Sequence, residues 1–451
     1  MKSYKISYLK KVLERNNHIM KKNTRREFVK KSGATVLAST LGFNILTASD
    51  YKRKINADTI KVGLIGCGGR GTGAALQATM ADPNVVLTAM GDAFTDRLEK
   101  SYDNLLIENP DKIMVDAEHK FVGFDSYKKV LETDVDVVIL ATPPCFRPAH
   151  IEASIVAGKH IFAEKPLAVD GPGIRRVIAS AKLAKEKGLS FMSGFCWRHD
   201  IPKIDSYKRI LDGAIGDVHT VYNTYNTGAL WSHDRKADWS DMEYQLRNWL
   251  YYTWMSGDHI IEQAIHSIDL MRWGFGDELP ISAVGTGGRQ SRTEEKYGNI
   301  FDHFATIYEY ADGRKGVHIS RQQKDCSRAY HVEMLGTGGR SYLDVFRKHE
   351  IMPAGKSSWL WEGENSNMYQ NEHNTLFAGI RKGEYFNDGV KAAESTMMGI
   401  LARMVAYTGQ TITYEDALNS QEVLGPNIDD YAMNQAWPMR SVAQPGITKF
   451  V

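Results

Sequence analysis

The sequence contains a glycine-rich turn of the kind that binds the phosphates of a dinucleotide. Gly66-Cys67-Gly68-Gly69-Arg70-Gly71 follows a short β-branched run over residues 59–65 and precedes a helix-compatible stretch over residues 73–80. In this spacing the first glycine permits a tight turn, the second lets the backbone approach a pyrophosphate, and the third allows the helix to pack on the strand. The N–H groups that begin the helix then face the phosphates. We therefore predict that Gly66, Gly68, Gly69, Arg70 and Gly71 bind a dinucleotide cofactor.

An acidic residue further along bears on which dinucleotide this is. Asp92 lies 26 positions after Gly66, just beyond a second predicted strand over residues 85–90. A carboxylate there accepts hydrogen bonds from a ribose diol, which favours NAD over NADP. Arg97 is placed to reach a 2′-phosphate, so NADP stays open, as does a glycine turn with an unrelated surface aspartate.

A second group of polar residues follows later strands of the same predicted domain. Thr142-Pro143 comes after a run over residues 135–141, and Glu164-Lys165-Pro166 comes after a run over residues 160–163. Ligands of open α/β sheets bind outside the carboxyl ends of the strands, so we predict that these residues border the cofactor. A lysine at position 165 can reach both nicotinamide and substrate. Taken alone, the Glu-Lys-Pro triplet is more typical of a surface turn, and its position gives it weight.

Polar residues at helical spacing supply a candidate proton relay. His259, Glu262 and His266 recur at intervals of three and four behind Ser256 or Asp258, either of which can cap a helix, so we expect one helix with these side chains on one face. An imidazole can take the proton of an alcohol as hydride leaves, while a carboxylate orients it. A zinc site is the competing function, but the HExxH order is absent and we predict no metal. A polar face satisfied by neighbouring loops is the structural alternative.

Aromatic residues gather around this segment. They are Trp197, Trp231, Trp239, Trp249, Tyr251, Tyr252 and Trp254. Aromatic faces stack on the C–H faces of sugar rings, so the cluster fits a carbohydrate cleft. A core or a dimer surface would use the same residues.

The elements that must position these groups form two domains. Strands alternating with helices over residues 59–195 predict a doubly wound parallel sheet, and we place a Rossmann domain over 57–196. Beyond it, alternating runs such as 303–310, followed by Asp312-Gly313, predict strands joined by hairpins. Residues 197–451 should therefore form a substrate-binding α/β domain, with an open, largely antiparallel sheet, helices on one face and C-terminal helices. The cleft between the domains is the expected site.

The N-terminal 48 residues have the composition of a targeting segment. Thr24-Arg25-Arg26-Glu27-Phe28-Val29-Lys30 precedes a weakly apolar stretch over residues 33–48 and resembles a twin-arginine export signal. A basic amphipathic helix of a cytosolic protein is the alternative. Without residues 1–48 the chain has 45 basic and 52 acidic residues, which argues against nucleic acid as a partner. The sequence has no apolar run of the roughly 20 residues that span a bilayer.

With these motifs in this order, the chain resembles the Gfo/Idh/MocA family of glucose-fructose oxidoreductase and inositol dehydrogenase relatives over roughly residues 57–420. The resemblance implies that Lys165 contacts substrate and nicotinamide and that His266 deprotonates the substrate hydroxyl. The family has Asp four positions before this histidine, whereas this chain has Glu262. We expect Glu262 to assist His266, and Trp197, Arg198, Asp258 and His259 to contact the substrate. The resemblance also implies a homo-oligomer formed through the second domain's sheet.

Three functions remain open on the sequence. The first is oxidation of a sugar, glycoside or polyol hydroxyl carbon with tightly bound NAD. The second is an NAD-dependent glycosidase that oxidises a sugar, eliminates the aglycone and reduces again. The third is a sugar-binding homologue without catalysis. An exported, periplasmic location favours a retained cofactor because free NAD is scarce outside the cytoplasm.

Overall fold

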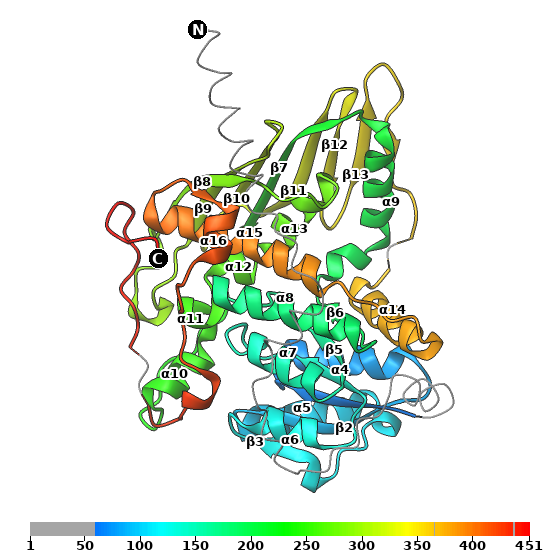
Figure 1. Ribbon diagram of the computed structural model, residues 1–451, viewed down its shortest axis with the longest axis vertical. Coiled ribbons are helices and arrows are strands. Elements are labelled where there is room, and N and C mark those ends of the chain that lie inside the picture. The colour runs from blue at the N-terminus through cyan, green and yellow to red at the C-terminus, as the bar shows by residue number, and fades with distance from the viewer. Residues whose placement is uncertain (1–58, 365, 436–437) are drawn as a thin grey trace, which may run out of the picture. The chain divides into compact units, whose positions relative to one another are not determined.

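The first half of the chain folds around a six-stranded parallel sheet. The structure, a computed structural model, describes residues 59–364, 366–435 and 438–451 (Figure 1). The sheet has the order β3-β2-β1-β4-β5-β6, and every neighbouring pair is parallel. Its strands are β1 Ile60–Ile65, β2 Val85–Asp92, β3 Lys120–Val122, β4 Val137–Leu140, β5 His160–Ala163 and β6 Phe191–Ser193. The predicted Rossmann sheet is confirmed.

The helices between these strands lie where the sequence places them, with shifted ends. They are α4 Gly69–Ala81, α5 Thr95–Glu108, α6 Ser126–Glu132, α7 Arg147–Val156 and α8 Gly171–Glu186. The first begins at Gly69, four residues before its expected start, because the glycine turn itself provides its first turn. Strand order reverses between β1 and β4, and the crevice outside their carboxyl ends is where such sheets bind ligands.

The second half folds around a nine-stranded sheet in the order β14-β13-β12-β11-β7-β10-β9-β8-β15. Only β7 and β10 among these pairs are parallel, so the sheet is mixed and mostly antiparallel, as expected. Its strands are β7 Val218–Thr227, β8 Ser282–Gly288, β9 His303–Glu309, β10 Lys315–Gln322, β11 Ala329–Gly336, β12 Gly339–Asp344, β13 His349–Pro353, β14 Trp359–Leu360 and β15 Ile412–Thr413. The predicted hairpin at Asp312-Gly313 joins β9 to β10.

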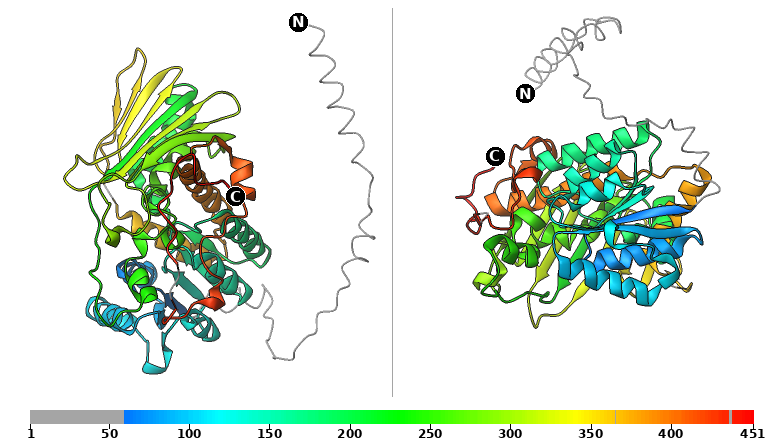
Figure 2. Two further views of the ribbon diagram at one scale, coloured as in Figure 1. Left: turned by 90° about the vertical axis from the view of Figure 1, so that its left-hand side faces the viewer. Right: turned by 90° about the horizontal axis from the view of Figure 1, so that it is seen from below.

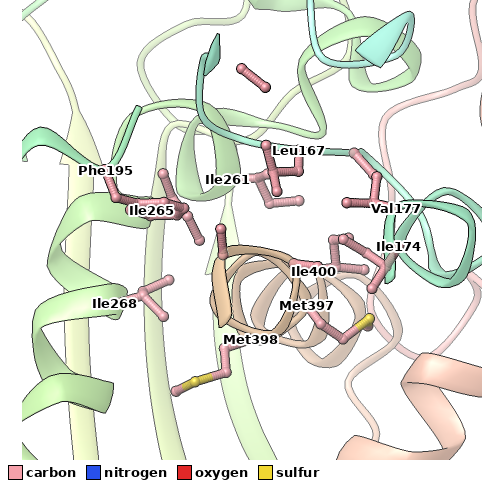
Figure 3. Close-up of a cluster of buried hydrophobic side chains, with 14 of the residues drawn as sticks. Leu167, Ile174, Val177, Phe195, Ile261, Ile265, Ile268, Met397, Met398 and Ile400 are labelled. Carbon is pink, nitrogen blue, oxygen red and sulfur yellow. The ribbon is translucent and has the colours of Figure 1, made fainter. Parts of the chain in front are cut away.

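One long helix joins the two halves. The helices of the second half are α9 Ile201–Arg209, α10 Asp241–Arg247, α11 Thr253–Ser256, α12 His259–Glu262, α13 Ile265–Gly274, α14 Met368–Lys382, α15 Gly389–Thr408 and α16 Tyr414–Asn419. Helix α15 packs against α8 of the first half and against α12, α13 and β8 of the second (Figures 1 and 2). Met397 and Ile400 of α15 meet Ile174 and Val177 of α8 in the shared core (Figure 3).

Helix α14 returns to the first half and packs along α4. Arg381 near its end pairs with Asp82 at 2.9 Å, and Gln370 near its start donates to the carbonyl of Gln77 at 2.9 Å. A segment from the last quarter of the chain therefore borders the helix that is predicted to bind the dinucleotide.

No helix within the described ranges is long and apolar enough to cross a membrane. The predicted export signal lies outside the described residues.

Candidate functional site

The glycine turn between β1 and α4 has the geometry of a phosphate cradle. Gly66 has φ +98°, a left-handed conformation that favours glycine. A Cβ added at Gly71 would lie 1.9 Å from the carbonyl oxygen of Gly66, whereas one added at Gly69 meets nothing within 4 Å. Glycine is therefore required at positions 66 and 71 and is free to vary at 69.

A pocket, here named the dinucleotide pocket after the ligand predicted for it, opens beside this turn, outside the carboxyl ends of β1, β2 and β4. It is lined by the predicted residues Gly66, Gly68, Asp92, Thr142 and Pro143, and by aromatic residues that the sequence analysis did not assign to it, namely Phe94, Phe124, Phe146 and Trp249. Aromatic walls beside a glycine cradle and a helix N-terminus fit the flat rings and the pyrophosphate of a dinucleotide.

Asp92 anchors the turn as well as lining the pocket. Its carboxylate accepts hydrogen bonds from the backbone N–H of Cys67 at 2.6 Å and of Phe94 at 2.9 Å. Burial raises the pKa of this carboxyl. Arg97 lines the same pocket, so a carboxylate and a guanidinium both lie near the predicted ribose position.

Lys165 and Glu262 meet across the boundary between the two halves. Lys165 follows β5, and its Nζ donates to the carbonyl oxygen of Glu262 and lies 3.6 Å from Oε1 of the same residue. The two side chains are 14% and 9% exposed. The nearly buried Lys165 is thus held at the end of α12 by Glu262, the residue that is predicted to assist His266 at the substrate.

His266 lies in an aromatic setting close to this pair. Its ring stacks on Trp197 with centroids 4.8 Å apart and meets the edge of Phe195 at 6.0 Å. Burial, reinforced by the positive charges of Lys165, Lys203 and Arg70, lowers the pKa of His266 well below 6.5. The imidazole is therefore neutral at pH 7 and able to accept a proton.

Two buried polar atoms at this point lack a partner within the described protein: Nδ1 of His266 and Oε2 of Glu262. Buried polar atoms are normally hydrogen-bonded, because leaving one unpaired costs about 1 to 3 kcal/mol. Hydroxyl groups of a ligand would satisfy both atoms.

The expected single helix behind Asp258 is wrong. The structure has two short helices, α12 and α13, separated by Gln263 and Ala264. The Asp258 carboxylate holds the first end by accepting from the backbone of His259 and Phe301, and Lys165 binds the carbonyl of Glu262 at the other. These tertiary contacts break the common face that the spacing predicted.

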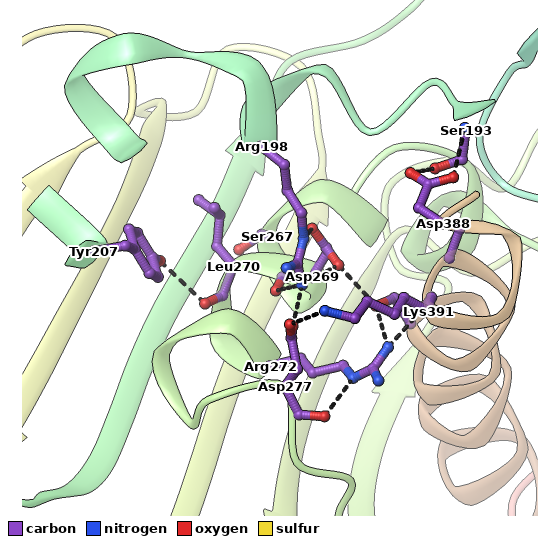
Figure 4. A network of polar contacts seen from close by, with 12 residues as sticks. Ser193, Arg198, Tyr207, Ser267, Asp269, Leu270, Arg272, Asp277, Asp388 and Lys391 are labelled. Atoms are coloured by element: carbon purple, nitrogen blue, oxygen red, sulfur yellow. Dashed lines mark hydrogen bonds and ion pairs between the residues drawn. The ribbon is translucent and has the colours of Figure 1, made fainter. Parts of the chain in front are cut away.

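His259, Asp258 and Arg198 are not brought together with Lys165 and His266. The His259 ring lies 3.2 Å from the carbonyl of Phe301 and stands edge-on to Phe304 in the second half's core. Arg198 is bound by Asp269 at 2.7 Å and by Asp277 at 2.7 Å (Figure 4). That these three residues contact the substrate stays a prediction.

The aromatic cluster divides among several places. Trp197 stacks on His266, and Trp249 lines the dinucleotide pocket. Tyr251, Tyr252 and Trp254 belong to a buried core, so for these three the alternative interpretation is correct.

Arg70 joins the cradle to the predicted residue Glu164 and to two residues that were not predicted, Glu372 and Tyr369. Its guanidinium pairs with Glu164, bonds to Glu372 of α14 at 3.1 Å and lies over the ring of Tyr369 at 4.7 Å. Glu372 is fully buried, and desolvation raises the pKa of its carboxyl. No local pattern signals this contact, because 302 residues separate Arg70 from Glu372.

No group of three or more His, Cys, Asp or Glu side chains in the described part of the chain is arranged to hold a metal ion.

Comparisons with known proteins agree with this geometry. The model described as "Oxidoreductase family, NAD-binding Rossmann fold" matches residues 60–195, and that of the GFO/IDH/MocA C-terminal domain matches residues 206–341. Myo-inositol 2-dehydrogenase of Thermotoga maritima is 23% identical over 81% of this chain and its own entire length. A dTDP-3,4-didehydro-2,6-dideoxy-alpha-D-glucose 3-reductase of Actinomadura kijaniata is 32% identical over 37% of this chain, and the match spans 45% of the reductase.

The fold also matches a solved structure, that of levoglucosan dehydrogenase in complex with NADH and levoglucosan. The TM-score is 0.62 at 19% identity, and the match covers 79% of this chain and all of the other. The two family models adjoin along the chain and together span more than half of it. The chain therefore belongs to the Gfo/Idh/MocA family of oxidoreductases.

Proposed function

We propose that the protein transfers hydride from a hydroxyl-bearing carbon of a sugar or polyol to NAD. The observation that carries this proposal is the contact between Lys165 and Glu262, with His266 near enough to be affected by the charge of Lys165 and with two unpartnered buried polar atoms among the three residues. The names of two relatives, an inositol dehydrogenase and a levoglucosan dehydrogenase, support the substrate class.

Each of the three residues has its own role in the reaction, which follows from its charge. NAD, when bound, accepts the hydride. Neutral His266 accepts the proton of the reacting hydroxyl, and Lys165 stabilises the negative charge that develops on its oxygen. Glu262 holds the lysine and offers Oε2 to a neighbouring hydroxyl.

The first test is the absorbance of the purified protein near 340 nm, before and after sugars and glycosides are added. We expect co-purified NAD, identified after acid release, and a sugar-dependent rise. Release of an aglycone without net NADH would instead identify a redox-cycling glycosidase. Absence of both nucleotide and reaction, with NAD or NADP supplied, would overturn the enzyme assignment.

We also propose that the cofactor is tightly held. Residues 240–256, here named the strap, belong to the second half, but Leu246 and Trp249 line the dinucleotide pocket. Arg247 of the strap bonds to both carboxylate oxygens of Asp96 at 3.0 Å and lies 4.2 Å from the centre of the Phe94 ring. The strap therefore forms part of the wall around a cofactor seated in this pocket.

Arg247→Ala should raise the dissociation rate of NAD about ten-fold, since it removes a two-pronged ion pair and a cation–π contact worth about 1 to 1.5 kcal/mol together. Stopped-flow displacement of fluorescent NADH measures this rate. Arg235→Ala is the matched control, because Arg235 lies just ahead of the strap and pairs with Asp241 of the strap, a contact that stays within the second half. Equal rates in the two variants would contradict a retaining role for the strap.

Finally, we propose export through a twin-arginine route, on the basis of Arg25 and Arg26 ahead of a weakly apolar stretch. In a bacterial host, the full chain should reach the periplasm and the double variant Arg25→Lys, Arg26→Lys should stay in the cytoplasm. Immunoblots of the two fractions measure this. Retention of both forms in the cytoplasm would contradict the proposal.

A further inference from the structure

A second pocket, here named the outer pocket, lies between the start of α9, the β12–β13 hairpin and the start of α14. It shares no lining residue with the dinucleotide pocket. Space for the cofactor therefore does not account for it.

The outer pocket adjoins the catalytic residues through two aromatic contacts. Phe346 of its hairpin meets the ring of Trp197 edge-on at 5.9 Å, and Trp197 stacks on His266. On the other side, Tyr369 lies under Arg70, which pairs with Glu164 next to Lys165. On the first of these paths, Trp197 is the one side chain between the pocket-lining Phe346 and His266.

The rim of the outer pocket is aromatic and exposed. Phe346 is 56% and Tyr369 37% exposed, so both rings have a surface free to contact a ligand. Such rings stack on the C–H faces of a sugar.

The charges of the pocket leave one cation for hydrogen bonding. Lys203 is paired with Asp200 at 2.5 Å, and burial lowers the pKa of His349 to about 4, so this imidazole is neutral. The Arg347 guanidinium has no ion pair among the described residues and faces solvent. One free guanidinium can donate hydrogen bonds to the hydroxyl groups of a neutral ring. It would neutralise only one of the two negative charges of a nucleotide diphosphate.

We propose that the outer pocket binds the second ring of a glycoside whose first ring is oxidised beside His266 and Lys165. This inference rests on the proposed function and narrows its substrate class from free sugars to disaccharides or larger glycosides. Stacking on Phe346 and hydrogen bonds to Arg347 hold the second ring, and neither residue touches the reacting carbon.

The test compares kcat/KM of the holoenzyme for glucose, galactose, mannose and xylose with that for disaccharides carrying the same sugar at the non-reducing end. At least one disaccharide should exceed its free sugar ten-fold or more, mainly through a lower KM. Turnover of free sugars with no such preference, or a preference for UDP-glucose over every disaccharide, would overturn the inference and leave the proposed function standing. No hydride transfer from any of them, or from inositol tested beside them, would remove both.

Phe346→Ala should raise KM for the preferred disaccharide about ten-fold, with kcat and the kinetics of the free sugar unchanged. Lys348→Ala is the matched control, because Lys348 lies on the same hairpin, pairs with Glu350 and does not line the pocket. An equal effect of Phe346→Ala on the free sugar and the disaccharide would show that Phe346 acts on the reacting ring, contrary to the inference.

Discussion

Replacing His266 with asparagine should lower kcat for sugar oxidation about a thousand-fold, the usual contribution of a general base. Asparagine keeps a polar group of similar size against Trp197 but accepts no proton at neutral pH. Binding of NAD should stay unchanged, because His266 does not line the dinucleotide pocket. Single-turnover absorbance at 340 nm and cofactor titration measure the two quantities.

The pH dependence of the oxidation rate should reflect the protonation of His266. The base acts in its neutral form, and burial lowers its pKa, so the neutral form persists below the usual value of 6.5. The oxidation rate should therefore stay level from about pH 8 down to about pH 6 and fall only as pH passes through the lowered pKa. A midpoint at 6.5 or above in the wild-type protein would contradict this role.

His259→Asn is the control for the same prediction. His259 is also buried and lies on the neighbouring helix, but it contacts Phe301 and Phe304. The His259→Asn substitution should lower stability and leave kcat per folded molecule within about three-fold of the wild-type value, well short of the loss expected for a general base. A thousand-fold loss in both variants would mean that disturbed packing, rather than proton transfer, explains the effect at His266.

The second large effect is expected at the glycine cradle. In Gly71→Ala the new Cβ would lie 1.9 Å from the carbonyl oxygen of Gly66, so the turn must open. We expect the Kd of NAD to rise at least a hundred-fold and the free energy of unfolding to fall by about 1 to 3 kcal/mol, as in other overpacked sites. Calorimetric titration with NAD and thermal unfolding measure these changes.

Gly69→Ala offers a control two positions away. A Cβ at Gly69 meets nothing within 4 Å, and alanine in a helix is about 0.5 to 1 kcal/mol more stable than glycine. NAD should bind this variant as it binds the wild type, with an equal or higher unfolding temperature. If Gly71→Ala behaved in the same way, the cradle would not need the close approach seen here.

Local sequence was enough to predict the dinucleotide half of the protein. Strand, glycine turn, helix and acidic residue follow one another within 33 positions from Ile60 to Asp92, and each is set by local sterics or by burial on both faces of a parallel sheet. The antiparallel character of the second sheet was predictable for the same reason, from alternation along single strands.

On the substrate side, helical spacing led to the wrong prediction of a single helix. His259, Glu262 and His266 have the periodicity of one helix face, but contacts from distant residues hold the segment in two pieces. The carbonyl of Glu262 binds Lys165, which is 97 residues away, and the Asp258 carboxylate binds Phe301 and Tyr407. Long-range polar contacts of this kind outweigh local propensity and leave no periodic signal.

The sequence by itself therefore determined the fold class, the glycine cradle and the candidate acid–base residues, because these depend on neighbours along the chain. Only the tertiary structure decided that Lys165 holds Glu262, that Arg70 joins the cradle to Glu372, and that Phe346 and Tyr369 flank a second pocket. The physical reason is that α14 and α15 return to the first half after some 300 residues of chain, and which side chains then meet is set by three-dimensional packing.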